Sequence, residues 1–192
     1  MCRFIESICC LEGEAQLIDL HQERVNRTFL EFFPQYTPIK LSDIVQNIPA
    51  KGKYKCRVEY SCELHSIEFI FYQTPSIHSL QVVQSDSIEY EYKSTKREEL
   101  DRIFEQKGLA DDIIIVKNGR VTDSYFANLV FFDGKKWWTP DRPLLQGIKR
   151  QSLINLGMLK TKKIFKKDLS IFQKVSLINA MLDLGEVEVL LK

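Results

Sequence analysis

The sequence predicts an α+β protein with two lobes, and three observations support that fold class. Apolar and polar residues alternate over Tyr54–Tyr60 and again over Ser66–Tyr72, as in an antiparallel hairpin. Apolar residues recur at helical spacing between Leu20 and Phe33. The segment Gln73-Thr74-Pro75-Ser76 has the composition of a linker. Antiparallel strands with segregated helices, on both sides of one linker, are typical of the α+β class.

The elements before the linker form the first lobe. Phe4–Cys10 is an apolar strand that enters a turn at Glu12-Gly13-Glu14. The helix from Leu20 ends at Phe33, because the ring of Pro34 cannot continue it. A short helix is expected from the N-cap candidate Ser42 to Ile48. We therefore assign residues 1–73 to a small α/β domain, 74–78 to the linker and 79–192 to a larger domain.

The larger domain begins with strands and one charged helix. Asn118-Gly119 is a strong hairpin-turn dipeptide that leads into an apolar segment, and Gly134 turns the chain again. The expected elements, in chain order, are a strand at Leu80–Gln84, an extended stretch at Ile88–Tyr92, a helix from about Thr95 to Lys107, a buried strand at Ile113–Val116, extended chain over Val121–Phe132 and near Trp137-Trp138, a helix at Ile148–Leu156, and strands near Val175–Ala180 and Val187–Leu191.

Composition and charge exclude several classes of protein. The 192 residues are 44% hydrophobic and 28% charged, which is ordinary for a globular chain and unlike a disordered one. A formal net charge of +1 argues against a protein that coats DNA. We find no signal peptide and no membrane span, so we expect a cytoplasmic protein without a membrane or nucleic-acid partner.

The cysteines and the basic run near the C-terminus are interpreted as structural features rather than functional ones. The five cysteines include no CxxC pair and are expected to be reduced and mostly buried. Cys56, Cys62 and His65 lack a fourth ligand and a zinc-site spacing, so no metal site is predicted. A solvated strand edge protected by lysines is the favoured reading of the basic run Lys160, Lys162, Lys163, Lys166 and Lys167.

Composition and periodicity do not identify an active site, since the chain lacks the phosphate-loop, nucleophile-elbow and zincin motifs. The order of several short segments is more informative. They are His21–Thr28 with the pattern H-x-x-R-V-x-x-T, Tyr92-Lys93 at an expected strand end followed by Arg97, Asn118–Asp123 running into Ala127-Asn128-Leu129, Trp138-Thr139-Pro140, Leu144–Arg150 and Leu177–Met181. In this order they closely resemble the class IV aminotransferases, the fold-type IV pyridoxal-phosphate enzymes. The resemblance extends from Ile5-Glu6-Ser7 to Val187, and it implies a small α/β lobe followed by a larger pseudo-barrel lobe.

The resemblance implies a catalytic role for Lys93 and an electrostatic role for Asp123. Lys93 matches the family lysine that attaches to the cofactor as a Schiff base and moves protons at the substrate. That chemistry requires a neutral amine, so a depressed pKa is expected. Asp123 stands where most members carry Glu, the carboxylate that pairs with the pyridine nitrogen and keeps the ring an electron sink. Asp keeps the charge but has a shorter reach.

The remaining residues implied by the resemblance bind the cofactor phosphate. Arg24 matches the phosphate-binding arginine, a role that suits its fork of donors. Ile148 and Lys149 belong to the loop that opens a helix toward the phosphate, where Lys149 replaces a frequent Thr. Asn179 and Ala180 resemble the loop that closes over phosphate and substrate carboxylate. In this loop Glu186-Val187 replaces the usual Pro-Val.

The resemblance further implies pyridoxal 5′-phosphate as cofactor, a homodimer, and an amino acid or amino-chorismate as substrate. We favour 4-amino-4-deoxychorismate lyase, which releases pyruvate and leaves 4-aminobenzoate for folate biosynthesis. The reason is that Arg97, four residues after Lys93, and Asn179-Ala180-Met181 look more lyase-like than transaminase-like. The alternatives are an aminotransferase acting on a small amino acid and a non-catalytic cofactor-binding relative. The chain begins almost at its first strand and has short loops for the family, so the resemblance does not identify the substrate.

Overall fold

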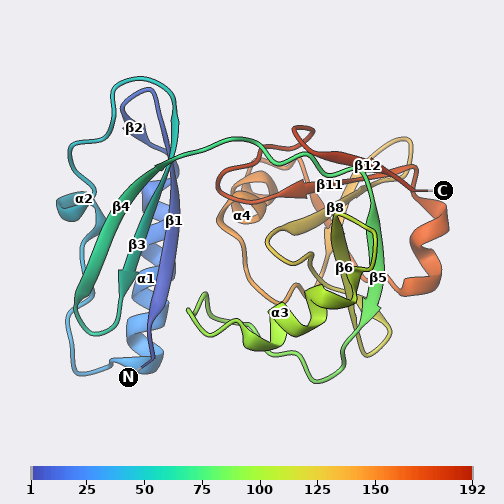
Figure 1. Cartoon of the computed structure of the whole chain (residues 1–192), viewed down its shortest axis with the longest axis horizontal. Helices are drawn as coiled ribbons and strands as arrows, with labels where there is room; N and C mark the ends of the chain where they lie inside the picture. The colour runs from blue at the N-terminus through green and yellow to red at the C-terminus, as the bar shows by residue number, and fades with distance from the viewer. Residues whose placement is uncertain (1, 192) are drawn as a thin grey trace. The chain divides into compact units, whose positions relative to one another are not determined.

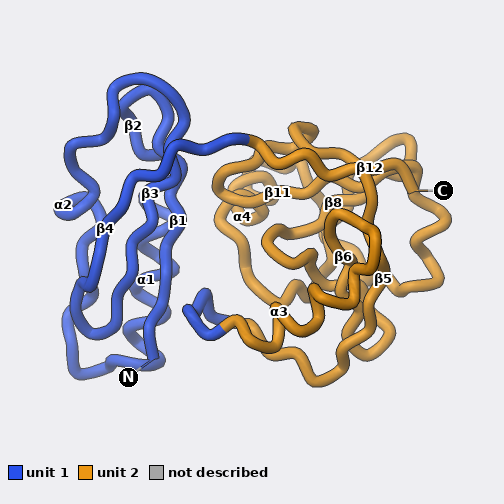
Figure 2. Tube along the Cα trace, in the orientation of Figure 1, with its two compact units in different colours: residues 1–73, 92–96 blue, residues 74–91, 97–192 orange. Residues whose placement is uncertain are grey.

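The structure is a computed structural model that describes residues 2–191. The chain forms two compact units, residues 1–73 with 92–96 and residues 74–91 with 97–192, coloured separately in Figure 2. The first unit thus includes a short segment from beyond the expected linker. Main-chain hydrogen bonds account for this, because the Ile5 N–H donates to Lys93 O and the Thr95 N–H donates to Arg3 O, each at 2.9 Å. The expected division at the linker 74–78 does not account for residues 92–96, because the chain comes back to the first unit there.

The first unit is built on a four-stranded antiparallel sheet in the order β2-β1-β3-β4. Its strands are β1 (Phe4–Leu11), β2 (Glu14–Ala15), β3 (Lys53–Tyr60) and β4 (Leu64–Phe71). The predicted first strand, its turn and the later hairpin are therefore confirmed. Within this unit α1 (Ile18–Phe32) lies along the sheet (Figure 1). Val25 and Phe29 of α1 pack with Ile8, Val58 and Tyr60 of the sheet to form the core of the unit.

The second helix of the first unit is shorter than predicted and begins elsewhere. It is α2 (Leu41–Ile44), and Lys40 rather than Ser42 occupies its N-cap position. A side chain of α1 determines this start, because Gln22 Oε1 accepts a hydrogen bond from the Leu41 N–H at 2.7 Å. The helix cannot extend to Ile48, because Asn47 has a φ of 56°, outside the helical region.

The second unit begins with a three-stranded sheet in the order β5-β6-β7. Its strands are β5 (Leu80–Gln84), β6 (Asp112–Lys117) and β7 (Arg120–Val121). Strands β5 and β6 are parallel, whereas the sequence predicted antiparallel strands. The reason is the helix α3 (Glu98–Phe104), which continues as a 3-10 turn at Glu105–Lys107 and provides the long connection that parallel neighbours need.

A five-stranded sheet in the order β10-β9-β8-β11-β12 completes the second unit. Its strands are β8 (Asn128–Phe132), β9 (Trp137–Pro140), β10 (Lys160–Lys162), β11 (Lys174–Ile178) and β12 (Glu188–Leu190), with the helix α4 (Ile148–Asn155) and a 3-10 helix at Lys166–Ile171. Strand β10 lies at the sheet edge and pairs in parallel with β9. The interpretation of the lysine run as a strand edge is confirmed for Lys160 and Lys162 only, since Lys163 follows the strand and Lys166 and Lys167 begin the 3-10 helix.

Three sequence expectations were wrong in the region between β5 and β8. Ile88–Tyr92 contains no strand, so Lys93 does not lie at a strand end. The charged helix begins at Glu98 rather than Thr95, because Ser94 and Thr95 pair with the start of β1. The segment Val121–Phe132 is not one strand, since the chain leaves β7 after Val121 and re-enters a sheet at Asn128.

The cysteines have the reduced state that the sequence predicted. None of the five cysteines, all within residues 2–191, forms a disulfide bond, and Cys9, Cys10 and Cys56 are buried. Within residues 2–191 no group of three or more His, Cys, Asp or Glu side chains is arranged to hold a metal ion. None of the helices in this part of the chain is both long enough and apolar enough to cross a membrane.

Candidate functional site

The predicted site residues are divided between the two units. Arg24 and Lys93 belong to the first unit. The second unit carries Asp123, Ile148, Lys149, Asn179 and Ala180. Each group has its own local geometry.

Arg24 is buried in the first unit and held by a carboxylate of β1. The motif residues His21, Arg24 and Thr28 follow one another at helical spacing, so they share the face of α1 that is buried. Arg24 donates from Nε to Glu6 Oε1 at 2.8 Å and from Nη2 to Glu6 Oε2 at 2.5 Å. The Arg24 side chain is only 8% exposed. A burial this deep excludes the alternative of an ordinary surface arginine.

Glu6 also binds His21, and the three side chains form one buried network. His21 Nδ1 lies 2.6 Å from Glu6 Oε2. Burial by itself would raise the pKa of Glu6, but the charge and hydrogen bonds of Arg24, together with His21, lower that pKa to about 2. Burial lowers the pKa of His21. A neutral His21 therefore donates from Nδ1 to an ionised Glu6, and its buried Nε2 has no hydrogen-bond partner among the described residues.

The sequence analysis missed the role of Glu6, although a signal was present. Glu6 alternates with Phe4, Ile8 and Cys10 along β1, and all four are buried on one face of the strand. A carboxylate at a position that alternation assigns to the core needs a buried cationic partner. The H-x-x-R helix that follows supplies that partner.

Lys93 is placed by main-chain contacts with β1 rather than by a strand of its own. Its carbonyl accepts from the Ile5 N–H at 2.9 Å, and the adjacent Ser94 forms an isolated bridge with Phe4. Ile5 is the neighbour of Glu6, so consecutive residues of β1 position the two predicted site residues of this unit. The charge of Lys93 also contributes to lowering the pKa of His21.

In the second unit Asp123 is buried and its two carboxylate oxygens have different partners. Oδ1 accepts from Asn128 Nδ2 at 2.7 Å, and Oδ2 accepts from the Leu145 N–H at 2.9 Å. Burial raises the pKa of Asp123 to about 6 despite these hydrogen bonds. A nearby cation would stabilise the ionised form. This environment differs from that of an exposed turn residue.

Asn128 connects Asp123 to the start of α4. It donates to Leu145 O at 2.9 Å, and its Oδ1 would lie 1.8 Å from a Cβ placed on Gly147, the N-cap residue of α4. Only glycine fits there. The first turn of α4 contains Ile148 and Lys149 and has no acidic residue. The positive end of the helix dipole therefore keeps its favourable potential for an anion.

The turn after β11 contains Asn179 and Ala180 and is tied to α4. Asn179 Oδ1 accepts from the Met181 N–H at 2.8 Å, and Asn179 Nδ2 donates to Phe126 O at 3.3 Å. Lys149 Nζ forms an ion pair with Asp183 Oδ1, two residues beyond Met181. The second unit thus connects the first turn of α4 with the Asn179 turn.

A model of the family described as amino-transferase class IV matches residues 4–189. The chain belongs to the class IV aminotransferase family. Class IV aminotransferases are pyridoxal-phosphate enzymes, so the predicted family, its fold, a pyridoxal-phosphate-dependent enzyme and its cofactor are all confirmed at the level of the family.

Three relatives show how far the similarity extends. A protein of Haemophilus influenzae without an assigned activity is 36% identical over 181 residues, which cover 92% of this chain and 96% of the relative. A crystal structure of a candidate 4-amino-4-deoxychorismate lyase from Haemophilus somnus is 31% identical, with a TM-score of 0.90 over 96% of this chain and 98% of its own. A candidate amino-acid aminotransferase from Mesorhizobium loti has the same fold, with a TM-score of 0.82, 16% identity, and coverage of 98% and 99%.

The side chains of this class IV chain fit pyridoxal phosphate. A buried arginine, held by Glu6, and a helix that starts at Gly147 without acidic residues are groups suited to a phosphate. The buried carboxylate of Asp123 is suited to a protonated ring nitrogen, because burial raises its pKa even beside the charge of Arg150, and a further cation would stabilise the ionised form. A cofactor aldehyde requires a nucleophilic amine, and Lys93 carries a side chain of that chemistry.

Proposed function

We propose that the chain is a pyridoxal-phosphate-dependent lyase that converts 4-amino-4-deoxychorismate to 4-aminobenzoate and pyruvate, a reaction of folate biosynthesis. The observation that carries this proposal is the likeness to the candidate lyase of Haemophilus somnus, at 31% identity and a TM-score of 0.90 over 96% of the chain. Likeness over nearly the whole of both chains favours a shared activity over a shared fold alone.

Arg97, the residue that we took as lyase-like, has a well-defined environment in the second unit. Its guanidinium lies over the rings of Tyr90 and Tyr125, at 5.5 and 4.6 Å from their centroids. Nη2 donates to Tyr125 O at 2.9 Å and Nη1 donates to Tyr90 Oη at 3.3 Å. Arg97 is the N-cap residue of α3 and directly follows the segment 92–96 that carries Lys93. The side chain of Arg97 is thus held by Tyr90 and Tyr125.

In the proposed site the residues of the chain divide the binding of the cofactor. In the first unit Arg24, oriented by Glu6, is proposed as a phosphate-binding residue. In the second unit the main-chain amides of Ile148 and Lys149 are suited to the same kind of group. Asn179 and Ala180 would close over the phosphate from their turn. Asp123 would pair with the ring nitrogen, and Lys93 would hold the aldehyde carbon. Bound pyridoxal phosphate supplies an electron sink for the carbon that bears the substrate amine.

The proposed reaction needs one base and one acid at the substrate. The Lys93 amine would remove the proton from the ring carbon that bears the amino group. The carbon–oxygen bond to the enolpyruvyl group then breaks, the ring becomes aromatic, and pyruvate leaves after it takes up a proton. The ammonium form of Lys93 can return that proton, so a single residue serves as base and then as acid.

An aminotransferase acting on a small amino acid is the second candidate. It is favoured by the family itself and by the fold shared with the Mesorhizobium loti protein at a TM-score of 0.82. A non-catalytic cofactor-binding relative is the third, and the replacement of Glu by Asp123 favours it. The three candidates predict different products from the same purified protein.

The deciding experiment measures pyruvate and 4-aminobenzoate released from 4-amino-4-deoxychorismate, beside a panel of D- and L-amino acids tested with 2-oxo acids. The lyase should release both products in equal amounts. Borohydride should fix the mass of the cofactor onto the peptide that contains Lys93, and Lys93→Ala should abolish colour, labelling and turnover. Transamination without pyruvate release would replace the lyase with the second candidate, and a labelled but inactive protein would favour the third.

The proposal extends to assembly and location. A homodimer is expected from the family, and sedimentation equilibrium should show twice the mass of the 22.5 kDa chain. The lack of disulfide bonds among the five cysteines, all within residues 2–191, supports a reducing compartment, the cytoplasm. A monomeric mass in solution would contradict the dimer.

A further inference from the structure

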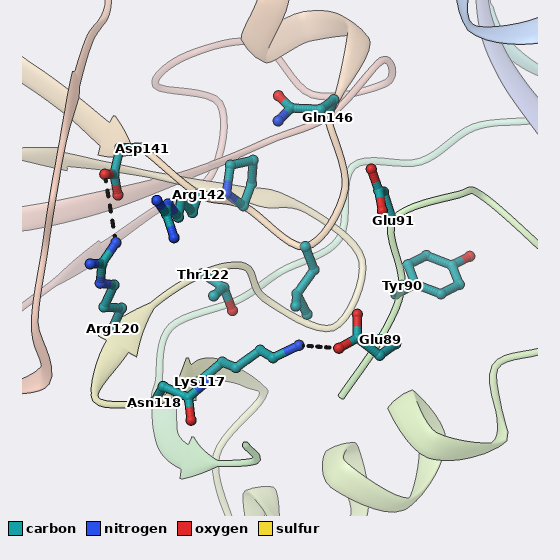
Figure 3. A pocket seen from close by; sticks show the side chains of 12 residues that line it. Glu89, Tyr90, Glu91, Lys117, Asn118, Arg120, Thr122, Asp141, Arg142 and Gln146 are labelled. Carbon is teal, nitrogen blue, oxygen red and sulfur yellow. Dashed lines mark hydrogen bonds and ion pairs between the residues drawn. The ribbon is translucent and has the colours of Figure 1, made fainter. Parts of the chain in front are cut away.

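The second unit contains a cavity of about 600 Å³ that is lined by none of the predicted cofactor residues (Figure 3). Three segments form it: the end of β6 and its turn into β7, residues 89–91, and the loop 141–146. A volume of this size lies within the range of pockets that bind small molecules. The cavity is therefore large enough to bind a small molecule other than the cofactor.

Two arginines of the cavity have donors that the protein does not satisfy. The Nη1 atom of Arg120 is buried and has no hydrogen-bond partner among the described residues. Its nearest carboxylate oxygen in an ion pair, Asp141 Oδ2, is 3.9 Å away, which is too far for a hydrogen bond. Arg142 makes no hydrogen bond or ion pair with any residue in the range 2–191. Figure 3 shows both arginine head groups on the same side of the cavity.

The third cation of the cavity differs, because its partners are already in place. Lys117 Nζ donates to Glu89 Oε1 at 2.6 Å and to Ile88 O at 2.7 Å. One acidic side chain is thereby neutralised within the protein. The donors left for a ligand are therefore the buried Nη1 of Arg120 and the exposed guanidinium of Arg142.

We propose that this cavity binds a small monocarboxylate between Arg120 and Arg142. The planar guanidinium fork matches the two oxygens of a carboxylate, and a buried donor such as Arg120 Nη1 calls for an acceptor. Gln146 Oε1 already accepts from Arg150 Nη1 at 3.0 Å, so its amide nitrogen remains to donate to a further ligand oxygen. The carboxylates of Asp141 and Glu91 also line the cavity. Like-charge repulsion from them favours a monoanion over a dianion such as phosphate.

The site is separate from the proposed cofactor residues but adjoins them along the chain. Thr122 lines the cavity and precedes Asp123, and Gln146 lines it and precedes Gly147. A bound carboxylate would thus contact the two segments that hold Asp123 and begin α4. The proposal does not depend on which reaction the enzyme catalyses.

Equilibrium binding to the purified full-length holoenzyme tests the site, with lactate as the monocarboxylate probe and lactamide as its uncharged counterpart. Lactate should bind saturably, with amide NMR shifts at Asn118 and Gln146, and lactamide should bind at least about tenfold more weakly, since it lacks the charge. Arg142→Ala, at an exposed position, and Arg120→Ala should each weaken lactate binding about tenfold or more. Arg102→Ala, which removes an exposed arginine of α3 outside the cavity, should leave it unchanged.

Several outcomes would overturn the proposal. Equal binding of lactamide and lactate would show that the charge is not recognised. Parent-like affinity in Arg142→Ala and Arg120→Ala, or the absence of saturable binding, would show that the arginines do not form the site. Tighter binding of inorganic phosphate than of lactate, lost in the same two variants, would replace the monocarboxylate with a phosphate.

Discussion

Glu6 accepts hydrogen bonds from both Nε and Nη2 of Arg24, at 2.8 and 2.5 Å, and is itself completely buried. The carboxylate comes from β1 and the arginine from α1, so this pair also joins the helix to the sheet. A two-point contact in a buried setting fixes the plane of the guanidinium. An arginine proposed to bind phosphate needs such a fixed orientation, and the first predictions follow from this pair.

Arg24→Ala should weaken pyridoxal-phosphate binding by about 1.5–3 kcal/mol, the usual contribution of a hydrogen bond to a charged group. It should also lower the free energy of unfolding by about 3–5 kcal/mol, because Glu6 is left as a buried charge without its partner. Cofactor titration of the apoprotein and urea unfolding measure the two effects. Arg27→Ala, at an exposed position of the same helix, is the matched control. Unchanged cofactor affinity in Arg24→Ala would remove this residue from the proposed site.

The free energy of unfolding should depend on Glu6 in acid. Its pKa is about 2 in the folded protein and 4.5 as an unperturbed group, so its contribution is complete above about pH 4.5 and is lost as the pH falls toward 2. The difference corresponds to a contribution on the order of 3 kcal/mol. Urea unfolding at several pH values between these limits should show a shallower loss of stability in Glu6→Gln. Glu31→Gln, on the exposed side of α1, should keep the slope of the parent protein, and an identical slope in Glu6→Gln would contradict the prediction.

Asp123→Asn should slow removal of the substrate α-proton by orders of magnitude while leaving covalent attachment of the cofactor intact. The substitution removes the charge that stabilises a protonated ring nitrogen. An asparagine also keeps only one of the two acceptors that bind Asn128 Nδ2 and the Leu145 N–H, which costs about 1–3 kcal/mol. Single-turnover rates with deuterated substrate, beside the visible spectrum, measure the effect. Asp123→Glu should retain activity if the carboxylate is the essential feature. A parent rate in Asp123→Asn would show that the carboxylate has only a structural role.

Gly147→Ala should destabilise the second unit by about 2 kcal/mol or more, because the new Cβ would lie 1.8 Å from Asn128 Oδ1. The backbone itself is not the cause, since Gly147 has a φ of −73°, which alanine adopts readily. Thermal unfolding of Gly147→Ala measures the cost. In the Asn128→Ser background the shorter side chain leaves room for the new Cβ. Gly147→Ala should therefore cost less stability in that background than it does in the parent protein. Full additivity of the two single changes would contradict a steric origin.

The sequence was informative where local patterns determine structure. Helix α1, the β3–β4 hairpin and the core of the first unit follow from periodicity, because the burial of one face determines each element. The order of motifs located Arg24 and Asp123, which the structure shows as buried charged groups. Local pattern also identified the edge position of β10 from its lysines.

The features that the sequence did not reveal depend on contacts between distant residues. The conformation of Tyr92–Lys96 is set by main-chain bonds to β1, which no local propensity encodes. The parallel pairing of β5 with β6 depends on where α3 packs, and the shortened α2 depends on one side chain of α1. The carboxylate of Glu6 was passed over because it lies within an otherwise apolar strand. The cavity at Arg120 is formed by three segments whose proximity has no sequence signature.

The hydrogen bond from the Ile5 N–H to Lys93 O has a consequence for how long the enzyme can keep its cofactor. The lysine segment forms no helix or regular strand of its own, and its main chain pairs with the start of β1, so its local stability depends in part on that strand. Any opening that frees the start of β1 also frees the residue proposed to attach the cofactor. The rate at which β1 opens then limits how long the enzyme keeps its cofactor bound. Loss of the yellow colour would therefore report on opening at the start of β1.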